Sequence, residues 1–245
     1  MRTFLVVAAA LFAMPALGVE PAAETNRAFD QYVAAAEKQL RDGAFLYSDT
    51  HPEAKTAART GETVVVQQRS GEVRITGGLI HDWLGFSFFP GAHLAEVRAL
   101  MQNYANYKSV YALDVIDSKL LGQNGDNFRV FLKMQNKRFI TLTYDSEFEV
   151  SYSAPAADRL EIVSHSARVQ QAGSDQGFLW RLNSYWRFVE ADDGVYAECR
   201  SISLSRGIPF GFGWLHEPLE KFPRDSMVRT MESTRRAATG GFARH

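Results

Sequence analysis

The chain has 245 residues, of which 27 are Lys or Arg and 28 are Asp or Glu, so its formal net charge is −1. Because it is nearly neutral and has no basic block, we expect it to bind neither nucleic acid nor an anionic membrane surface. Its one cysteine, Cys199, excludes an internal disulfide. We expect this residue to be a small buried side chain in a strand rather than a reactive thiol.

The first 18 residues, MRTFLVVAAALFAMPALG, have the three parts of a secretory signal peptide. Arg2 precedes an apolar run from Phe4 to Met14, and small residues end at Gly18. That run is too short to span a bilayer, and no later apolar run approaches the length that a membrane-spanning helix needs. We therefore expect a secreted or periplasmic protein cleaved after Gly18, with no integral membrane segment in the mature chain. No Cys stands directly after the apolar run, so no lipid anchor is expected.

Residues 19–61 are expected to form an N-terminal helix followed by a linker-like loop. Apolar residues recur at helical spacing between Thr25 and Arg41, and Asp42-Gly43 ends the pattern. They are Phe29, Tyr32, Val33, Ala36 and Leu40. Two β-rich runs, ETVVVQQR and EVRIT, come next and are joined by Ser70-Gly71, which predicts a hairpin.

The stretch HDWLGFSFFPG predicts a strand that leads directly into a helix. Its aromatic residues favour a strand from Leu79 to Phe89, which Pro90-Gly91 ends, and a helical pattern runs from Ala92 to Tyr104. His81 stands beside Asp82, which suggests a catalytic pair. Neighbouring residues of a strand point to opposite faces, so the two side chains cannot act together. His81 is then either a structural histidine or a ligand contact.

The next hundred residues predict six antiparallel strands joined by short turns. The strands are Leu113–Leu121, Asn127–Gln135, Arg138–Tyr152, Leu160–Gln171, Leu179–Glu190 and Val195–Leu204. A final helix opens at Phe222-Pro223-Arg224-Asp225 and runs to Ala238, and residues 241–245 form a frayed tail. One face of such a sheet must be buried, and the last helix is the available partner. The order predicts an α+β helix-grip: a curved antiparallel sheet around a long C-terminal helix.

Two long segments resemble the START-like superfamily, which includes polyketide cyclases and coenzyme Q-binding START proteins. They are FSFFPGAHLAEVRALMQNYANYKSVYALDVIDSKLL and WRLNSYWRF…GVYAECRSISLSRGIPFGFGWLHEPLEKFPRDSMVRTMESTRRA. The resemblance implies one helix-grip domain over residues 62–240, with a cavity between sheet and helix for a hydrophobic or amphipathic small molecule such as a lipid, quinone or isoprenoid. The N-terminal helix is an addition to the pattern, and no catalytic signature of the cyclases is present.

Alternation along the last predicted hairpin places its large aromatic side chains opposite small ones. Trp180, Leu182, Ser184, Trp186 and Phe188 share one face, across from Val195, Ala197, Cys199, Ser201 and Ser203. This face is predicted to lie inside, under the C-terminal helix. On the other face, Arg187 is expected to meet Glu198 in a solvated ion pair.

Eight residues are the candidate ligand contacts: Trp83, Arg168, Trp180, Trp186, Phe210, Trp214, Met227 and Met231. The two methionines suit an adaptable binding surface. Arg168 is a buried cation if its strand face lies inside, and a solvated side chain if it lies near the strand end. Phe210 and Trp214 form either a gate or a packed plug. The alternative for the whole site is a core that the Trp rings fill.

Motifs for metal, nucleotide or nucleophilic chemistry are lacking in the sequence. The six histidines have no zinc-ligand spacing, GFSFF fails as a nucleophile elbow, and GFGWLH lacks the third glycine of a dinucleotide fingerprint. We therefore predict no metal, no cofactor and no catalytic residue. Two other functions remain open: a cyclase- or hydrolase-like enzyme using His165, His81 or Glu198, and a module that binds an envelope protein through aromatic residues at 210–214.

Overall fold

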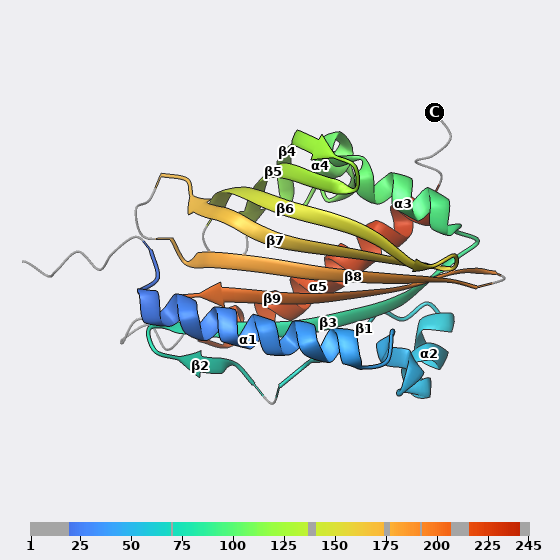
Figure 1. Cartoon of the computed structure of the whole chain (residues 1–245), viewed down its shortest axis with the longest axis horizontal. Helices are drawn as coiled ribbons and strands as arrows, with labels where there is room; N and C mark the ends of the chain where they lie inside the picture. The colour runs from blue at the N-terminus through green and yellow to red at the C-terminus, as the bar shows by residue number, and fades with distance from the viewer. Residues whose placement is uncertain are drawn as a thin grey trace, which may run out of the picture.

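A nine-stranded antiparallel sheet forms the centre of the computed structural model, which describes residues 20–69, 71–136, 141–173, 177–191, 193–206 and 216–240. The helix α5 (His216–Thr239) lies behind the sheet in Figure 1, and α1 (Ala23–Asp42) lies in front of it. The predicted signal peptide, Phe210, Trp214 and residues 241–245 fall outside the described residues. Within the described ranges, no helix combines the length and hydropathy needed to cross a membrane.

Across the sheet the strands follow the order β1-β3-β9-β8-β7-β6-β5-β4, and β2 also pairs with β3. Their bounds are β1 Val64–Gln67, β2 Val73–Ile75, β3 Gly78–Pro90, β4 Val115–Asn124, β5 Asn127–Asn136, β6 Leu142–Ala156, β7 Arg159–Gln171, β8 Leu179–Ala191 and β9 Gly194–Ser205. Strands β4 to β9 form the predicted meander, in which each strand pairs with the next. Because β3 pairs with β9, the first long strand lies beside the last one.

The expected hairpin between the first two β-rich runs is wrong. β1 and β2 do not pair with each other; both pair with β3, as Val65 does opposite Gly85 and Arg74 opposite Leu79. The tight turn lies instead between β2 and β3, where Gly77 adopts a positive φ of 77° that suits glycine. β3 spans 13 residues, so its edge accommodates both short strands end to end.

The helices outside the sheet also depart from the sequence prediction in two places. The expected loop of residues 43–61 contains a short 3-10 turn (Tyr47–Asp49) and the helix α2 (Pro52–Arg59), whose buried side chains are only alanines. α5 begins at residue 216 rather than 222 and holds Pro223 inside it. A proline removes one helical hydrogen bond without necessarily ending the helix. The remaining helices are α3 (Leu94–Gln102) and α4 (Tyr107–Val110), with a 3-10 turn at Tyr104–Asn106 between them.

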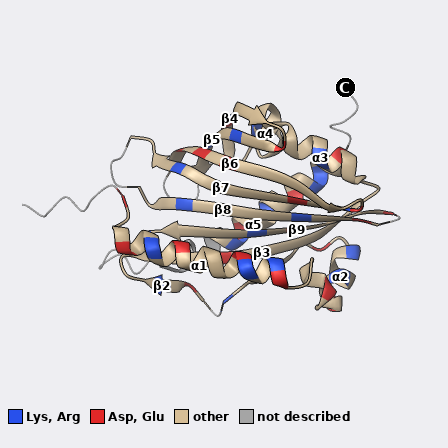
Figure 2. Ribbon diagram, in the orientation of Figure 1, with Lys and Arg blue, Asp and Glu red and all other residues tan. Residues whose placement is uncertain are grey.

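The sheet is buried on both faces near β3, β9 and β8. On the inner face, which faces α5, Phe89, Phe188 and Met231 belong to the largest core cluster. On the outer face α1 covers Ile80 and Ile202, among others, and α2 covers a second cluster. Figure 2 shows acidic and basic residues interspersed along α1, as expected for a helix with one face in water and the other on the sheet. The added N-terminal segment therefore packs outside the grip.

Charged side chains are buried between the sheet and this N-terminal segment. Arg200 makes two bonds to Asp82, at 2.9 and 2.6 Å, and Tyr32 donates to the same carboxylate at 2.8 Å. Arg187 donates to Glu161 at 2.8 Å and to three backbone carbonyl groups of residues 40–45. It lies opposite Glu198 in the register, as expected, but both are buried, so the expected solvated pair is wrong. α1 and the segment after it exclude water from this face.

Removing Asp82 should destabilise the fold strongly. Asp82→Ala leaves the buried guanidinium of Arg200 without its partner, and we expect the free energy of unfolding in urea to fall by about 3–5 kcal/mol. Asp42→Ala removes the acid of the exposed Lys38–Asp42 pair on α1 and is the matched control, with little change expected. Equal losses in the two variants would contradict a stabilising role for the buried pair.

Glu198 should make stability depend on pH. Its burial raises the pKa to about 7, although the N–H of Tyr47 and the charge of Arg187 act in the opposite direction. A carboxyl group whose pKa is raised on folding stabilises the fold below its unfolded value of about 4.3 and loses that contribution as pH rises through 7.

Substituting this residue therefore tests the linkage. The free energy of unfolding of Glu198→Gln, minus that of the wild type, should rise between pH 4.5 and pH 7.5 by on the order of 1–3 kcal/mol. Glu24→Gln, at an exposed position of α1, is the matched control. A difference that stays flat with pH for Glu198→Gln would show that this carboxyl group is not protonated in the fold.

Candidate functional site

A cavity of about 330 Å³ lies between the inner face of the sheet and α5. The sheet supplies its floor and two of its walls, and the segment from α3 to Asp114 supplies a third wall. Most of the lining side chains are apolar or aromatic, among them Trp83, Tyr104, Phe148, Trp186 and Met227. A volume of this size is at the lower end of the range for small-molecule sites.

The floor of the cavity is a line of small side chains on β9. Cys199, Ser201, Ser203 and Ser205 occupy every second position, so they all point to the inner face. Strand β8 on one side and β3 on the other carry larger residues, with Trp186 opposite Cys199 and Trp83 opposite Ser201. Small residues between larger neighbours leave a groove along the strand.

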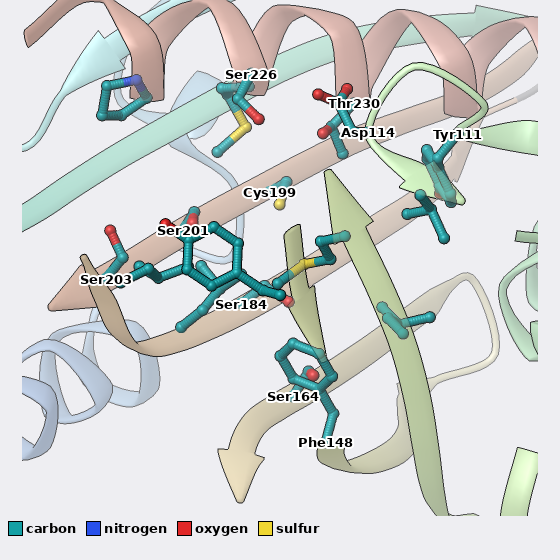
Figure 3. A pocket seen from close by; sticks show the side chains of 18 of the residues that line it. Tyr111, Asp114, Phe148, Ser164, Ser184, Cys199, Ser201, Ser203, Ser226 and Thr230 are labelled. Atoms are coloured by element: carbon teal, nitrogen blue, oxygen red, sulfur yellow. The ribbon is translucent and has the colours of Figure 1, made fainter. Parts of the chain in front are cut away.

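The ring of Trp186 forms a wall of the groove instead of filling it. It stacks on Phe188 with ring centroids 5.5 Å apart and planes only 5° from parallel. Stacking fixes the indole against its neighbour, and the cavity lies over Cys199 and Ser201. Figure 3 shows these two side chains on the floor beneath α5. The alternative of a core filled by Trp rings does not describe this face of the sheet.

Two sets of contacts hold α5 over the floor. At β3, Gly85 allows close approach: a Cβ there would lie 2.8 Å from both Met227 Sδ and Met231 Cγ. On the opposite side, Arg229 donates to both oxygens of Asp114, at 3.0 and 2.7 Å. The helix is thus fixed along both edges of the cavity, and Met227 reaches the space between them.

Tyrosines close one end of the cavity and satisfy one another's hydroxyl groups. Tyr152 and Tyr107 each donate to the carbonyl of Met101 at 2.6 Å, and the hydroxyls of Tyr104 and Tyr152 lie 2.7 Å apart. Since Tyr152 already donates its proton to Met101, Tyr104 must be the donor in that pair. Burial raises the pKa of Tyr104 and Tyr152 far above the usual value, so these phenols stay neutral and offer mainly ring surface.

The polar end of the cavity is formed by His81, Glu72 and Ser205. His81 Nε2 lies 2.8 Å from Ser205 Oγ, and Nδ1 lies 3.5 Å from a carboxylate oxygen of Glu72. Burial lowers the pKa of His81 to about 4, so the imidazole is neutral at pH 7 and its contact with Glu72 is not an ion pair. A hydrogen on Nδ1 suits the nearby carboxylate and leaves Nε2 to accept from Ser205.

This order of contacts has the connectivity of a Ser-His-acid triad, but two properties argue against proton transfer. A histidine whose pKa is about 4 is a weak general base at neutral pH. Ser205 is only 2 % exposed, and its hydroxyl also lies 3.4 Å from the carbonyl of Arg206. The cluster is therefore better described as a hydrogen-bonded structural histidine that borders the cavity.

Of the eight candidate ligand contacts, Trp83, Trp186 and Met227 line the cavity. Met231 is fully buried in the adjoining core, next to Gly85. Phe210 and Trp214 lie outside the described residues. The placement of Trp180 on the inner face is wrong, and Arg168 is exposed to solvent rather than a buried cation; both residues fall at irregularities of strand pairing.

β-Bulges explain both positions. The register of β8 shifts between Leu179 and Arg181, and Trp180 packs with the outer cluster under α1. β7 carries one extra residue, Ala167, so Arg168 lies opposite Glu147 and is exposed on the outer face. Because side chains alternate with period two, one inserted residue moves every later side chain to the opposite face.

Of the three residues considered for catalysis, one borders the cavity and two lie on the outer face of the sheet. His81 borders the cavity, whereas Glu198 lies under the N-terminal segment and His165 contacts Glu37 of α1 at 2.8 Å. Cys199 is buried as expected, and burial raises its pKa far above the usual value, which leaves the thiol unreactive. Within the described ranges, no three potential metal ligands come together.

Several lining residues were not singled out from the sequence. On β6 they are Tyr144, Phe148, Val150 and Tyr152, and the tyrosines at 104, 107 and 111 form the end wall. The alternation of Phe148, Val150 and Tyr152 with polar residues was a usable signal for an inward face. The tyrosine wall had no such signal, because it is assembled from a helix end and two short turns.

Comparison with known proteins identifies the fold. No protein-family model and no curated protein matches the chain. Among solved structures, a STAR-related lipid transfer protein from Xanthomonas axonopodis aligns over 71 % of this chain and 96 % of its own, with 15 % identity and a TM-score of 0.50. A protein from Thermus thermophilus aligns over 65 % and 98 %, with 12 % identity and a TM-score of 0.51. The chain therefore has the START-like helix-grip fold, as the sequence resemblance predicted.

The close approach at Gly85 is directly testable. Gly85→Ala places a methyl group within 2.8 Å of two methionine side chains of α5, and we expect it to lower the free energy of unfolding by about 1–3 kcal/mol. Gly122→Ala, in β4, is the matched control because a Cβ there meets nothing within 4 Å. If both variants unfold at the same urea concentration, α5 does not depend on this contact.

Proposed function

We propose that this protein is exported and that it binds and carries an apolar or amphipathic small molecule, such as a lipid, quinone or isoprenoid, between its sheet and α5. One observation carries the proposal: a cavity of about 330 Å³, lined mainly by apolar and aromatic side chains, lies between the inner face of the sheet and α5, where a packed core would be expected. Interiors are normally packed with few voids larger than a water molecule. An apolar space of this size suits an apolar ligand.

Burial supplies the expected affinity. Each buried methylene contributes about 0.8 kcal/mol, so a chain of about ten carbons would gain on the order of 8 kcal/mol before the cost of immobilising it. A gain of about 8 kcal/mol corresponds to a dissociation constant of about 1 μM if nothing is lost, and the cost of immobilisation weakens binding from that value. Met227, which is unbranched and flexible, allows the roof to adjust to ligands of different shape.

Likeness of fold adds limited support. The Xanthomonas axonopodis structure bears the name of a lipid transfer protein, but similarity at 15 % identity concerns architecture, and one fold serves many functions. The proposal therefore rests on the cavity of this chain. Export is supported by the signal-like residues 1–18.

Filling the cavity should abolish binding. Native mass spectrometry of the protein purified from its own envelope, followed by organic extraction, should show an apolar compound bound at near-stoichiometric amount. Ser184→Phe places an aromatic ring in the floor and should release that compound. Ser153→Phe, on an exposed position of β6, is the matched control and should retain it.

The same spectra give the mass of the protein, which should correspond to a chain that starts after Gly18. Thermal unfolding of both variants shows whether they fold. A wild-type protein without a bound compound, or a folded Ser184→Phe protein that keeps it, would contradict the proposal. In the first case, the envelope-protein module would become the better hypothesis.

A further inference from the structure

The cavity is polar in a particular way: it offers hydroxyl groups and has no cation among its described lining residues. Six of the serine and threonine side chains that line it make no side-chain hydrogen bond to another residue in the part of the chain that the structure describes. They are Ser164, Ser184, Ser201 and Ser203 on the floor, and Ser226 and Thr230 on α5. Figure 3 shows the two α5 residues across the cavity from Ser201 and Ser203.

Strand register brings the floor hydroxyls into one row. Ser164 lies opposite Ser184, and Ser184 lies opposite Ser201, so three neighbouring strands present a serine at the same level. Next in this row, on β3, is Trp83, whose buried indole Nε1 has no hydrogen-bond partner in the described structure. Buried donors of this kind normally have a partner, so a bound molecule that accepts a hydrogen bond would complete the site.

The charged side chains that line the cavity disfavour an anionic ligand. Among the described residues that line the cavity, the acidic side chains are those of Glu72 and Asp114, and none of these residues is Lys or Arg. Asp114 is neutralised by its paired bonds from Arg229. His81 is neutral, as shown above. A carboxylate or phosphate that is buried in this space would lose its water without gaining a cation from the described lining residues, which is strongly unfavourable.

We infer that the cavity selects an uncharged ligand bearing a hydroxyl or carbonyl oxygen, which is placed against the serine row, and that it discriminates against fatty acids and phosphate esters. This inference rests on the proposed function and narrows its ligand class. Hydroxyl groups suit such an oxygen because each of them can donate or accept. Rejection of charged analogues follows from desolvation, which is a common source of specificity.

Matched probes with 12 carbons test the inference. The uncharged dye N-phenyl-1-naphthylamine reports occupancy of the cavity by its fluorescence, and 1-dodecanol and dodecanoate compete with it at pH 7.5. We expect dodecanol to displace the dye at a concentration at least about tenfold lower than dodecanoate. At pH 5, where more of the acid is protonated, the gap should narrow.

Two variants locate the effect. Ser201→Ala combined with Ser203→Ala should weaken dodecanol binding about three- to tenfold and weaken binding of the dye, which has no oxygen, by less. Thr230→Lys introduces a cation opposite the row and should shift the preference toward dodecanoate. An unaltered dodecanol affinity in the double alanine variant would overturn the role of the serine row, whether or not the lysine variant folds.

The outcomes separate this inference from the proposed function. If the dye binds the wild-type protein and dodecanoate competes as well as dodecanol or better, selection for an uncharged ligand is wrong while the apolar carrier stands. If neither the dye nor either probe binds, the proposed function itself fails. Preference for dodecanol, together with loss on removing the serine hydroxyls, would support both.

Discussion

The alternation of side chains along β9 is the constraint on which the rest of the structure depends. Arg200, Ile202 and Leu204 point outward, under α1, and the small residues between them point inward. One strand therefore separates a tightly packed outer layer from an open inner one. A period of two residues makes this separation possible without any change of backbone geometry.

An open inner face has an energetic consequence. A cavity lacks the dispersion contacts that a filled core would make, so the domain loses stabilisation where its ligand is expected to bind. The N-terminal segment adds buried surface on the opposite face of the same strands, through Phe29 and Leu46 among others. This outer packing and the buried Asp82–Arg200 pair fix the strands whose inner side chains line the cavity. The addition to the grip thus supports the site without touching it.

Much of this fold was predictable because its signals are local and repeated. Six consecutive strands and the last helix followed from alternation, short turns and helical spacing, and Trp83, Trp186 and Met227 reached the cavity as their patterns indicated. Trp180 did not, and Arg168 lies on the outer face, because a bulge in each strand inserts one residue and reverses the faces beyond it, and no residue type marks that insertion. The alternation of residue types therefore predicts which face a side chain occupies only up to the first bulge in its strand.

The burial of charged side chains on the outer face could not be predicted from the sequence for a different reason. Glu198 and Arg187 are charged, and charged side chains on a strand normally indicate a solvated face. Here α1 and the following segment cover them, and backbone groups supply the missing partners: the carbonyls of Leu40 and Phe45 accept from Arg187, and the N–H of Tyr47 donates to Glu198. Partners that come from irregular backbone leave no trace in residue type.

The two faces of the sheet differ in their polar groups: the outer face buries paired charges, and the inner face carries uncharged hydroxyl groups. On the outer face, charges are buried but are held by ion pairs and backbone groups, which makes burial tolerable. On the inner face, the chain places hydroxyl groups, which are polar enough to orient an oxygen and uncharged enough to remain in an apolar space. Had the cations of β8 and β9 pointed inward, the same cavity would suit an anion. Their position one residue out of phase with the serines keeps the two environments apart.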